Sequence, residues 1–475
     1  MNISAEFSVG RPSGRRRDSD SPMRILILGN WLGDQPAGSE LAERKPLRID
    51  FDNFTSVMTR LEPAVELPDY GTIGFSSIED FHPDTLCRRV DTLRQLHTLY
   101  RNLGDPARAR ELIAELDRPE VESASSDGDD ASATDLERLL GGKVDQDDTP
   151  SAQSQVQKLL SGLVAEHVVD TRAVEPYRQA TAARLGDHLR DILHDPRFQA
   201  LEANWRGLWW LVSQLIAEEI ELFLLPLTTE ELKTDLTNAG SDLARSDLCR
   251  LLMNGAAGQP WSVLAGLYEF GPDMGDLEVL MATGILAEAA GAPFVAAAAP
   301  QLAGCDRIED LINPADWAKP DDEMAAGWQT LRKSEPGDWI SLGLPRLMMR
   351  QPYGSKLDPI DGFAFEENPQ GPEQLLWASP AFGLATALGL NFLTHGQDLD
   401  TALPVELEDL PTFSHSVDGE MELQAATAVV LPDHAASALT SLGLCPLMGS
   451  RNRTEVRLPA CVAVSGRALS GSWRR

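Results

Sequence analysis

The chain has 475 residues, of which 43% are hydrophobic and 24% are charged, and its formal net charge is -32. This length is enough for roughly three domains with sizeable cores. The strongly negative charge disfavours binding to nucleic acid phosphates and to anionic membranes. No apolar run reaches the ~18–20 residues that a membrane-spanning helix needs, and the five cysteines have no paired spacing. The composition therefore predicts a soluble cytoplasmic protein with reduced thiols, no nucleic acid partner and no membrane insertion.

The first part of the chain, residues 1–116, has the pattern of a small α/β domain. Alternating apolar residues over Asn2–Val9 predict one strand, and the apolar run Met23–Leu28 predicts a second, buried strand. Thr72–Phe75 predicts a further short strand. Thr85–Asn102 carries apolar residues at helical spacing and predicts a helix. This part is therefore expected to mix strands and helices.

Residues 117–150 differ in composition from both flanks. They are rich in Ser, Asp and Ala and offer too little apolar surface to offset the entropy lost on ordering. We predict a flexible acidic linker here. Asp135–Leu140 can nucleate a short helix inside it, and helices are predicted beyond it at Gln155–Val169 and Pro176–Leu193.

The stretch Leu201–Gln214 is the segment around which the rest of the chain is organised. Its apolar residues recur at the i, i+4, i+7, i+8, i+11 spacing of one helical face. These residues are Leu201, Trp205, Leu208, Trp209 and Val212. Trp210 widens the apolar stripe, and Arg206 and Gln214 mark a more polar side. We predict a buried core helix for the larger part of the chain.

Strands and helices alternate after this stretch. Strands are predicted at Glu221–Leu225, Pro260–Tyr268, Pro293–Pro300 and Trp339–Leu344, and a helix is predicted at Asp276–Gly291. Strand, helix and strand in this order and spacing favour a parallel sheet with crossover helices. The predicted fold class is therefore α/β, with mixed sheets and crossover helices.

The C-terminal part continues with shorter elements. Glu373–Leu388 predicts a helix that Pro380 breaks or restarts. Val417–Val430 predicts a pair of strands, and Pro432–Leu442 predicts a further helix.

No combination of residues in the sequence predicts catalysis. Gly29 and Gly33 follow a strand, but a third glycine and a Lys-Ser/Thr pair are missing, so a structural turn is favoured over a phosphate-binding loop. The eight histidines form no pair at the spacing that metal ligands need on a helix. Ser341 and Ser465 do not lie in a G-x-S-x-G turn. We expect no enzyme activity, no cofactor and no metal.

The loop that follows the strand at Trp339–Leu344 is the candidate interface loop. It combines basic, methionine and tyrosine side chains, which are common in protein interfaces. These residues are Arg346, Met348, Met349, Arg350 and Tyr353. The alternative is a packed loop in which Arg346 or Arg350 neutralises buried acids. The sequence leaves both readings open.

Three blocks of the first part resemble a known family. They are RILILGNWLGD, ERKPLRIDFDNFTSVMTRLEP and FSSIEDFHPDTLCRRVDTLRQLHTLYRNL. In this order they are similar to the small sheath subunit of type VI secretion systems, the VipA or TssB family. The resemblance covers about residues 1–115.

Further blocks follow in order: HDPRFQALEANWRGLWWLV, WSVLAGLYEFG, AGAPFVAAAAPQLAG, WQTLRKSEPGDWISLGLPRLMMRQPYG, FAFEE, LLWASPAFGLATAL and ALTSLGLCPLMGSRNRTEV. They resemble the large sheath subunit, the VipB or TssC family, over about residues 155–465. The resemblance implies a natural fusion, with a small-subunit domain at 1–116, the linker at 117–150 and a large-subunit domain at 151–475. The usual C-terminal part of the large subunit, which contributes to the inner sheath wall, has no match before Arg475.

The resemblance also implies an architecture and a function. The expected protomer is a two-part α/β protein with the small-subunit half docked on the large-subunit half. Such protomers form a contractile sheath that surrounds and propels an inner tube, with the energy stored in the extended lattice. Sheets shared between neighbouring protomers link the lattice. The resemblance places the small-subunit share of these sheets at Ile3, Phe7, Val9, Arg24, Ile25, Leu26, Ile27 and Leu28.

The partners implied by the resemblance are all proteins. They are other sheath subunits or copies of this chain, an inner tube protein of hexameric rings, baseplate proteins and a AAA+ ATPase that recycles contracted sheaths. The ATPase would grip Asp135–Leu140 or Gln155–Val169. Two alternatives are a non-polymerising protein that caps, nucleates or regulates a sheath, and a nucleotide-dependent enzyme that uses the Gly29–Gly33 loop.

Overall fold

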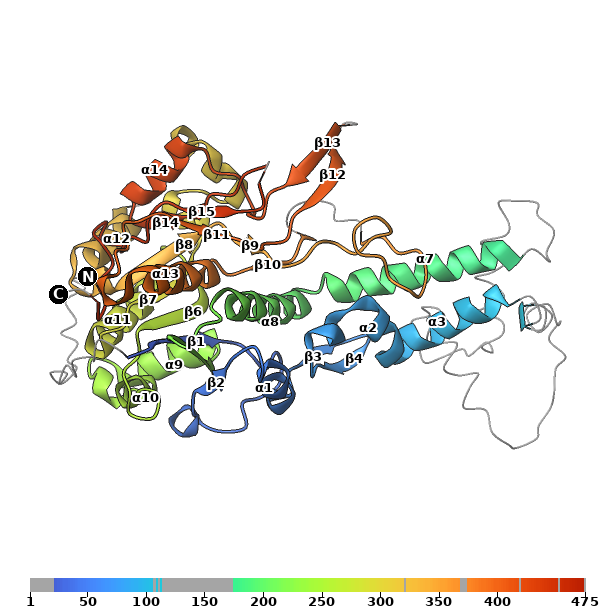
Figure 1. The fold of residues 1–475 in the computed structure, drawn as a ribbon, viewed down its shortest axis with the longest axis horizontal. Coiled ribbons are helices and arrows are strands. Elements are labelled where there is room, and N and C mark those ends of the chain that lie inside the picture. Colours follow the sequence, from blue (N-terminus) through green and yellow to red (C-terminus); the bar gives the residue numbers. More distant parts are fainter. Residues whose placement is uncertain are drawn as a thin grey trace.

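The computed structural model describes residues 21–105, 108–109, 112, 174–319, 322–367, 374–417, 420–451 and 453–473. Its centre is a seven-stranded sheet. The strands are β1 (Met23–Gly29), β2 (Leu47–Ile49), β5 (Ile220–Pro226), β6 (Val263–Phe270), β7 (Phe294–Ala298), β8 (Ile340–Leu344) and β14 (Leu444–Pro446). Their order in space is β14-β8-β7-β6-β1-β5-β2 (Figure 1). Neighbouring strands are parallel, except that β2 runs antiparallel to β5 at one edge. The predicted parallel sheet is confirmed.

Helices cover both faces of this sheet. On one face lie α8 (Pro196–Gln214) and α13 (Ala381–His395). On the other face lie α9 (Thr229–Ala239), α10 (Asp247–Asn254), α11 (Met274–Ala290), α12 (Asp322–Lys333) and α14 (Asp433–Ser441). The crossover connections between the parallel strands supply most of these helices, as expected for an α/β fold.

β1 contributes side chains to the cores on both faces. Successive residues of a strand point to opposite faces, so Ile25 and Ile27 join the core under α8 and α13, and Leu26 and Leu28 join the other core. All four side chains are at most 1% exposed. Burial on both faces explains why this strand appears in the sequence as an unbroken apolar run rather than as an alternating pattern.

The N-terminal part continues with elements that lie beside the sheet. They are α1 (Phe54–Leu61), β3 (Ala64–Leu67), β4 (Gly71–Gly74), α2 (Pro83–Arg89) and α3 (Asp91–Gly104). β3 and β4 pair as an antiparallel hairpin. The single helix predicted over Thr85–Asn102 is divided into α2 and α3, because the backbone at Val90 is extended (ψ 122°) and its side chain turns into the core.

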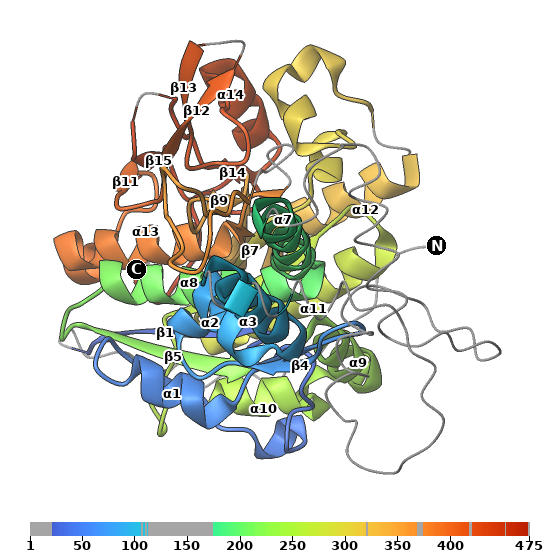
Figure 2. The same cartoon turned by 90° about the vertical axis from the view of Figure 1, so that its right-hand side faces the viewer.

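α3 packs along α7 (Val174–Leu193), and the two helices form an arm that extends away from the sheet (Figures 1 and 2). The guanidinium of Arg178 lies 4.7 Å from the ring centre of Tyr100 and donates to its hydroxyl at 3.0 Å. The helices run in opposite directions, so the end of α3 and the start of α7 lie at the same tip of the arm.

The C-terminal part adds three small antiparallel pairs. They are β9 (Leu347–Met348) with β10 (Trp377–Ala378), β11 (Val405–Leu407) with β15 (Val456–Leu458), and β12 (Phe413–Val417) with β13 (Glu420–Gln424). The helix predicted from Glu373 begins only at Ala381, because residues before Pro380 form β10 and proline lacks the N–H that a helix interior requires. The strand pair predicted at Val417–Val430 lies earlier in the chain: its first strand is Phe413–Val417 and its second ends at Gln424, and beyond it Ala426 accepts a hydrogen bond from Met348 instead.

The N-terminal part does more than dock on the larger part. β1 lies inside the sheet between β5 and β6, and β2 extends the same sheet at its edge. The two halves therefore share one sheet. The linker predicted at 117–150 and the helices predicted at Asp135–Leu140 and Gln155–Val169 lie outside the described residues. Within the described ranges, no helix is both long and apolar enough to span a bilayer.

Candidate assembly site

The joint between the two halves begins with the pairing of β1. Ile25 lies opposite Leu222 of β5 and Val263 of β6 in the ladder. At the start of the strand, the Arg24 guanidinium pairs with the Glu221 carboxylate at 2.7 Å, and the Arg24 N–H donates to the Ser262 hydroxyl at 2.6 Å. A strand from one half thus receives hydrogen bonds on both edges from the other half, which makes separation of the halves costly.

This pairing differs from the role predicted for Arg24, Ile25, Leu26, Ile27 and Leu28. Both edges of β1 are paired within the chain, so these residues present no free strand edge to a neighbouring protomer. The physical reason is that a strand with two apolar faces is most stable in the interior of a sheet covered by helices. The other predicted inter-subunit residues, Ile3, Phe7 and Val9, lie outside the described residues.

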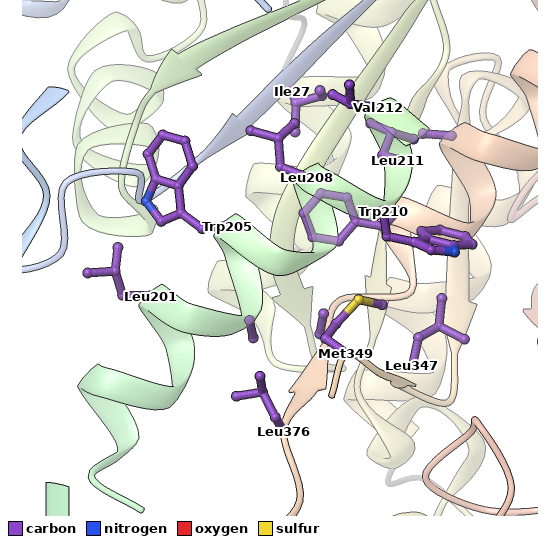
Figure 3. Close-up of a cluster of buried hydrophobic side chains, with 14 of the residues drawn as sticks. Ile27, Leu201, Trp205, Leu208, Trp210, Leu211, Val212, Leu347, Met349 and Leu376 are labelled. Carbon is purple, nitrogen blue, oxygen red and sulfur yellow. The ribbon is translucent and has the colours of Figure 1, made fainter. Parts of the chain in front are cut away.

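α8 is the helix that connects the shared sheet to the rest of the joint. Asp195 caps its first turn by accepting backbone N–H groups at 2.9 and 3.4 Å. The predicted apolar face points into the core, as Figure 3 shows for much of its length. Four of the five predicted residues are at most 2% exposed, and these are Leu201, Trp205, Leu208 and Val212. The fifth, Trp209, is half-buried.

Two aromatic residues of the N-terminal half meet this face. The ring centre of Trp205 lies 5.4 Å from that of Trp31 and 5.7 Å from that of Phe54, both in edge-to-face arrangement. Phe54 also lies 5.0 Å from Trp209. Sequence reasoning did not single out Trp31, which lies in the loop after β1, and so missed this contact. The available signal was a large aromatic residue next to a predicted buried strand.

The Gly29–Gly33 loop is a packed turn. The Asn30 side chain accepts the N–H of Gly33 at 3.0 Å and donates to the carbonyl of Gly33 at 2.9 Å. Gly33 has a positive φ of 69°, and a Cβ there would lie 2.3 Å from the carbonyl oxygen of Ala64. The loop is therefore filled by its own side chain and by β3, which agrees with the structural turn favoured from the sequence.

A buried network of charges lies on the polar side of α8. Glu202 is fully buried and pairs with the Nε of Arg206 at 2.7 Å and the Nε of Arg350 at 2.9 Å. The other nitrogens of Arg350 form a two-point contact with Glu367 at 2.7 and 3.0 Å. Arg206 also donates to the Tyr353 hydroxyl at 3.2 Å. The side of α8 that was predicted to be more polar is therefore an internal ion network and not a solvated surface.

The protonation state of this network follows from its geometry. Burial alone raises the pKa of the Glu367 carboxyl, but the charge of Arg350, a hydrogen bond involving His194 and the N–H of Tyr353 together lower this pKa to about 2. Glu367 is thus ionised at neutral pH. The Glu367 carboxylate and the Arg350 guanidinium therefore form an ion pair of opposite charges inside the joint.

The candidate interface loop is mostly internal in this chain. Met348, Met349, Arg350 and Tyr353 are buried, and Arg346 is exposed. The alternative reading, in which an arginine of this loop neutralises buried acids, is therefore the one that the geometry of Arg350 fits. Sequence reasoning did not identify the two acids, because Glu202 lies 148 residues and Glu367 lies 17 residues from Arg350, and no local pattern links either acid to it.

The segment after Tyr353 is held by the N-terminal half. The Asp84 carboxylate accepts the backbone N–H groups of Asp361 and Gly362 at 3.0 and 3.2 Å. Phe363 lies 5.9 Å from the Tyr100 ring of α3. These contacts attach a loop of the larger half to α2 and α3 of the smaller half, close to the buried charge network.

A second polar contact fastens the β3–β4 hairpin to the arm. The hydroxyl of Tyr70 lies 2.8 Å from Nδ1 of His188 and donates to Asp191 at 3.3 Å. Burial lowers the pKa of His188, and the nearby Arg184 lowers it further. His188 is consequently neutral at physiological pH and shares a hydrogen bond with the Tyr70 hydroxyl.

A cavity of about 290 Å³ lies at the carboxyl ends of β6, β7 and β8. Its wall carries charges of both signs, among them Glu269, Asp306, Arg307 and Arg346. No serine, threonine, cysteine, histidine or lysine is among the described residues that line it. In the described part of the chain, no three His, Cys, Asp or Glu side chains are placed to hold a metal ion.

Comparisons with known proteins agree with this arrangement. The model of the VipB family, described as EvpB/VC_A0108, tail sheath N-terminal domain, matches residues 179–463. The model described as Type VI secretion system, VipA, VC_A0107 or Hcp2, matches residues 7–119. The chain is also similar to the type VI secretion system sheath protein TssC1 of Pseudomonas aeruginosa, with 30% identity over 297 residues.

The match to TssC1 covers 59% of this chain and 59% of the length of that relative. The matched families are those of structural sheath proteins. The VipA match includes β1 and β2, and the VipB match includes all other strands of the seven-stranded sheet. The chain therefore belongs to the VipB family of tail sheath proteins, as a fused type VI secretion sheath protein with a VipA segment ahead of the VipB body.

Proposed function

We propose that this chain is a structural protomer of a type VI secretion contractile sheath that surrounds and propels an inner tube. The observation that carries the proposal is β1, which places a VipA-segment strand inside the sheet of the VipB body. A protomer that transmits the force of contraction requires halves that do not separate, and a shared sheet with two common cores meets this requirement. The work is done by rearrangement of contacts between protomers, so no enzyme activity and no cofactor are proposed.

The proposed partners are other copies of the chain, an inner tube protein of hexameric rings, baseplate proteins and a AAA+ recycling ATPase, all in the cytoplasm. The outer edge of β2 has no partner strand within the described residues, and an exposed strand edge can accept a strand from a neighbour. Phe51, directly after β2, is 50% exposed. We propose the predicted strand Asn2–Val9 as the segment that pairs with such an edge on a neighbouring copy.

Negative-stain electron microscopy of the purified chain, alone and with its cognate tube protein, tests the proposal. Tubules with a regular cross-section are the expected result. Discrete particles of one or two chains under both conditions would reject an autonomous sheath and favour a cap, nucleator or regulator of one.

The role of Asn2–Val9 has a separate test. Ile3→Asp with Phe7→Asp should abolish tubules and leave the melting temperature unchanged. Ser4→Asp with Ser8→Asp adds the same charge on the opposite side of the alternating pattern and serves as the matched control. Equal tubule formation by both variants would exclude strand donation by this segment.

A further inference from the structure

Two cysteines and a serine meet at the edge of the seven-stranded sheet. Cys445 lies in β14, Ser341 lies in the neighbouring β8, and Cys461 lies in the segment after β15. The Ser341 hydroxyl oxygen is 3.2 Å from Sγ of Cys445 and 3.5 Å from Sγ of Cys461. The three residues are at most 4% exposed. Two thiols that are distant from each other in the sequence therefore share one hydrogen-bonding centre.

Backbone contacts fix both sulfur atoms in this position. The N–H of Val462 donates to Sγ of Cys445 at 3.2 Å, and the carbonyl of Val462 accepts the Ser341 hydroxyl at 2.8 Å. The N–H of Cys461 donates to the carbonyl of Thr401 at 2.8 Å. The segment that carries Cys461 is thus held beside β8 and β14, and the two thiols are held as neighbours.

The two thiols differ chemically. Burial by itself raises the pKa of Cys445, but hydrogen bonds with the Cys461 and Ser341 side chains and with the N–H of Val462 outweigh burial and lower this pKa. The hydrogen bond to Cys445, with burial, raises the pKa of Cys461. The first proton to leave the pair therefore leaves Cys445, and Cys461 keeps its proton.

We propose that Cys445 and Cys461 form a peroxide-reactive thiol pair that closes into a reversible disulfide. In the first step, the Cys445 thiolate attacks one oxygen of hydrogen peroxide, the O–O bond breaks, and the released hydroxide takes a proton to become water. Cys445 is then a sulfenic acid. In the second step, the Cys461 sulfur attacks the Cys445 sulfur, the S–O bond breaks, and the Cys461 proton leaves with the hydroxide as a second water. Two thiols are oxidised and one peroxide is reduced.

The remaining cysteines lack this arrangement. Cys87, Cys249 and Cys305 are buried, and none of them takes part in the contacts that join Ser341, Cys445 and Cys461. Burial raises the pKa of Cys87 to about 12 and that of Cys305 to about 11, and it also raises the pKa of Cys249. A raised pKa keeps a thiol protonated and slow to react. Oxidation is therefore expected to be selective for the Cys445–Cys461 pair.

The disulfide would link the C-terminal segment to the edge strand β14. Because a cross-link removes conformations from the unfolded chain, the oxidised protein should be harder to unfold than the reduced protein. The disulfide would restrain the segment that follows β15. This segment packs beside β8 and completes the core there. Oxidation and reduction of this pair would thus control a covalent link at this edge of the sheet.

The test uses the full chain, reduced, desalted and then titrated with hydrogen peroxide near neutral pH. Thiols counted after denaturation should fall from five to three, and peptide mapping should identify a Cys445–Cys461 cross-link. The melting temperature should rise and then return to its starting value after treatment with dithiothreitol. Five remaining thiols, or thiol loss spread over Cys87, Cys249 and Cys305, would overturn the proposal.

Two substitutions separate the roles of the sulfurs. Cys461→Ser should stop the reaction at the sulfenic acid, so that dimedone labels Cys445 and no cross-link forms. Cys249→Ser, at a buried cysteine outside this pair, is the matched control and should still lose two thiols. Labelling of Cys461 instead of Cys445 in the wild-type chain would contradict the assigned order. The wild-type mapping remains decisive if a variant fails to fold.

Discussion

The indole N–H of Trp205 donates a hydrogen bond to the backbone carbonyl of Trp31 at 3.3 Å, across a sequence separation of 174 residues. Both indole rings are fully buried. One residue belongs to the VipA segment and the other to the VipB body. The contact joins the loop after β1 to α8, the helix that covers β1. We therefore expect the two halves to fold and unfold together.

Removal of the Trp205 side chain should destabilise the whole protein. Trp205→Ala deletes two edge-to-face contacts and leaves a cavity between α8 and the N-terminal half. We expect a loss of about 3–5 kcal/mol in the free energy of unfolding, measured by urea denaturation. Trp317→Ala, at a half-buried position, is the control and should cost less than about 2 kcal/mol. Equal losses for both variants would contradict the central role of Trp205.

The buried charge network should be far more sensitive than a surface ion pair. Arg350→Met leaves the Glu367 carboxylate buried without its guanidinium partner, and we expect a loss of about 3–5 kcal/mol. Arg350→Met with Glu367→Met should recover much of this loss, because Glu202 keeps Arg206 at 2.7 Å. Denaturant unfolding of the single and double variants measures the difference.

The control for this comparison is Arg197→Met, which removes an exposed pair with Asp195 and should leave stability nearly unchanged. If the double variant is as unstable as Arg350→Met alone, the loss does not come from an uncompensated buried charge.

Stability should decrease as the pH falls below about 6.5, the ordinary pKa of histidine. Burial lowers the pKa of His97 and of His188, and the nearby Arg101 and Arg184 act in the same direction. The nearby acids, Asp84, Asp69, Asp187 and Asp191, act against this shift without reversing it. The unfolded chain therefore binds more protons than the folded chain in this range, and protonation favours unfolding.

We expect a smaller free energy of unfolding at about pH 5.5 than at about pH 7.5. Glu367, with a pKa of about 2, does not contribute in this window, because it is ionised in the folded and unfolded states alike. His97→Gln with His188→Gln should flatten the dependence, whereas His434→Gln, at an exposed position, should not. An unchanged slope in the double variant would reject this assignment.

The two halves should assemble without a covalent connection. Residues 1–128 and 129–475, produced together as separate chains, should copurify, because β1 is held on both edges and α3 packs along α7. Affinity purification through a tag on the longer chain measures this. Ile27→Asp in the shorter chain should abolish copurification, because it places a charge at a fully buried position. Recovery of the longer chain alone would refute the prediction.

Sequence patterns were sufficient to predict most of the local elements. The apolar run of β1, the tryptophan face of α8 and the alternation of strands and helices after it follow directly from side-chain periodicity, which depends on neighbouring residues only. The same patterns predicted one helix where Val90 divides two, and a helix start before Pro380. These boundaries depend on where the chain must turn to pack, and periodicity does not contain that information.

The sequence by itself determined the fold class, the resemblance to the sheath protein families, the burial of β1 and the packing face of α8. Only the tertiary structure decided that β1 lies between β5 and β6, that Arg350 neutralises Glu202 and Glu367, and that Cys445 and Cys461 are neighbours. An apolar strand fits many sheets equally well, and a buried charge specifies that it needs a partner but not which one. The neighbours of the strand and the partner of the charge are both determined by long-range packing. The reason is that one arrangement of the chain must satisfy all its buried hydrogen bonds and charges.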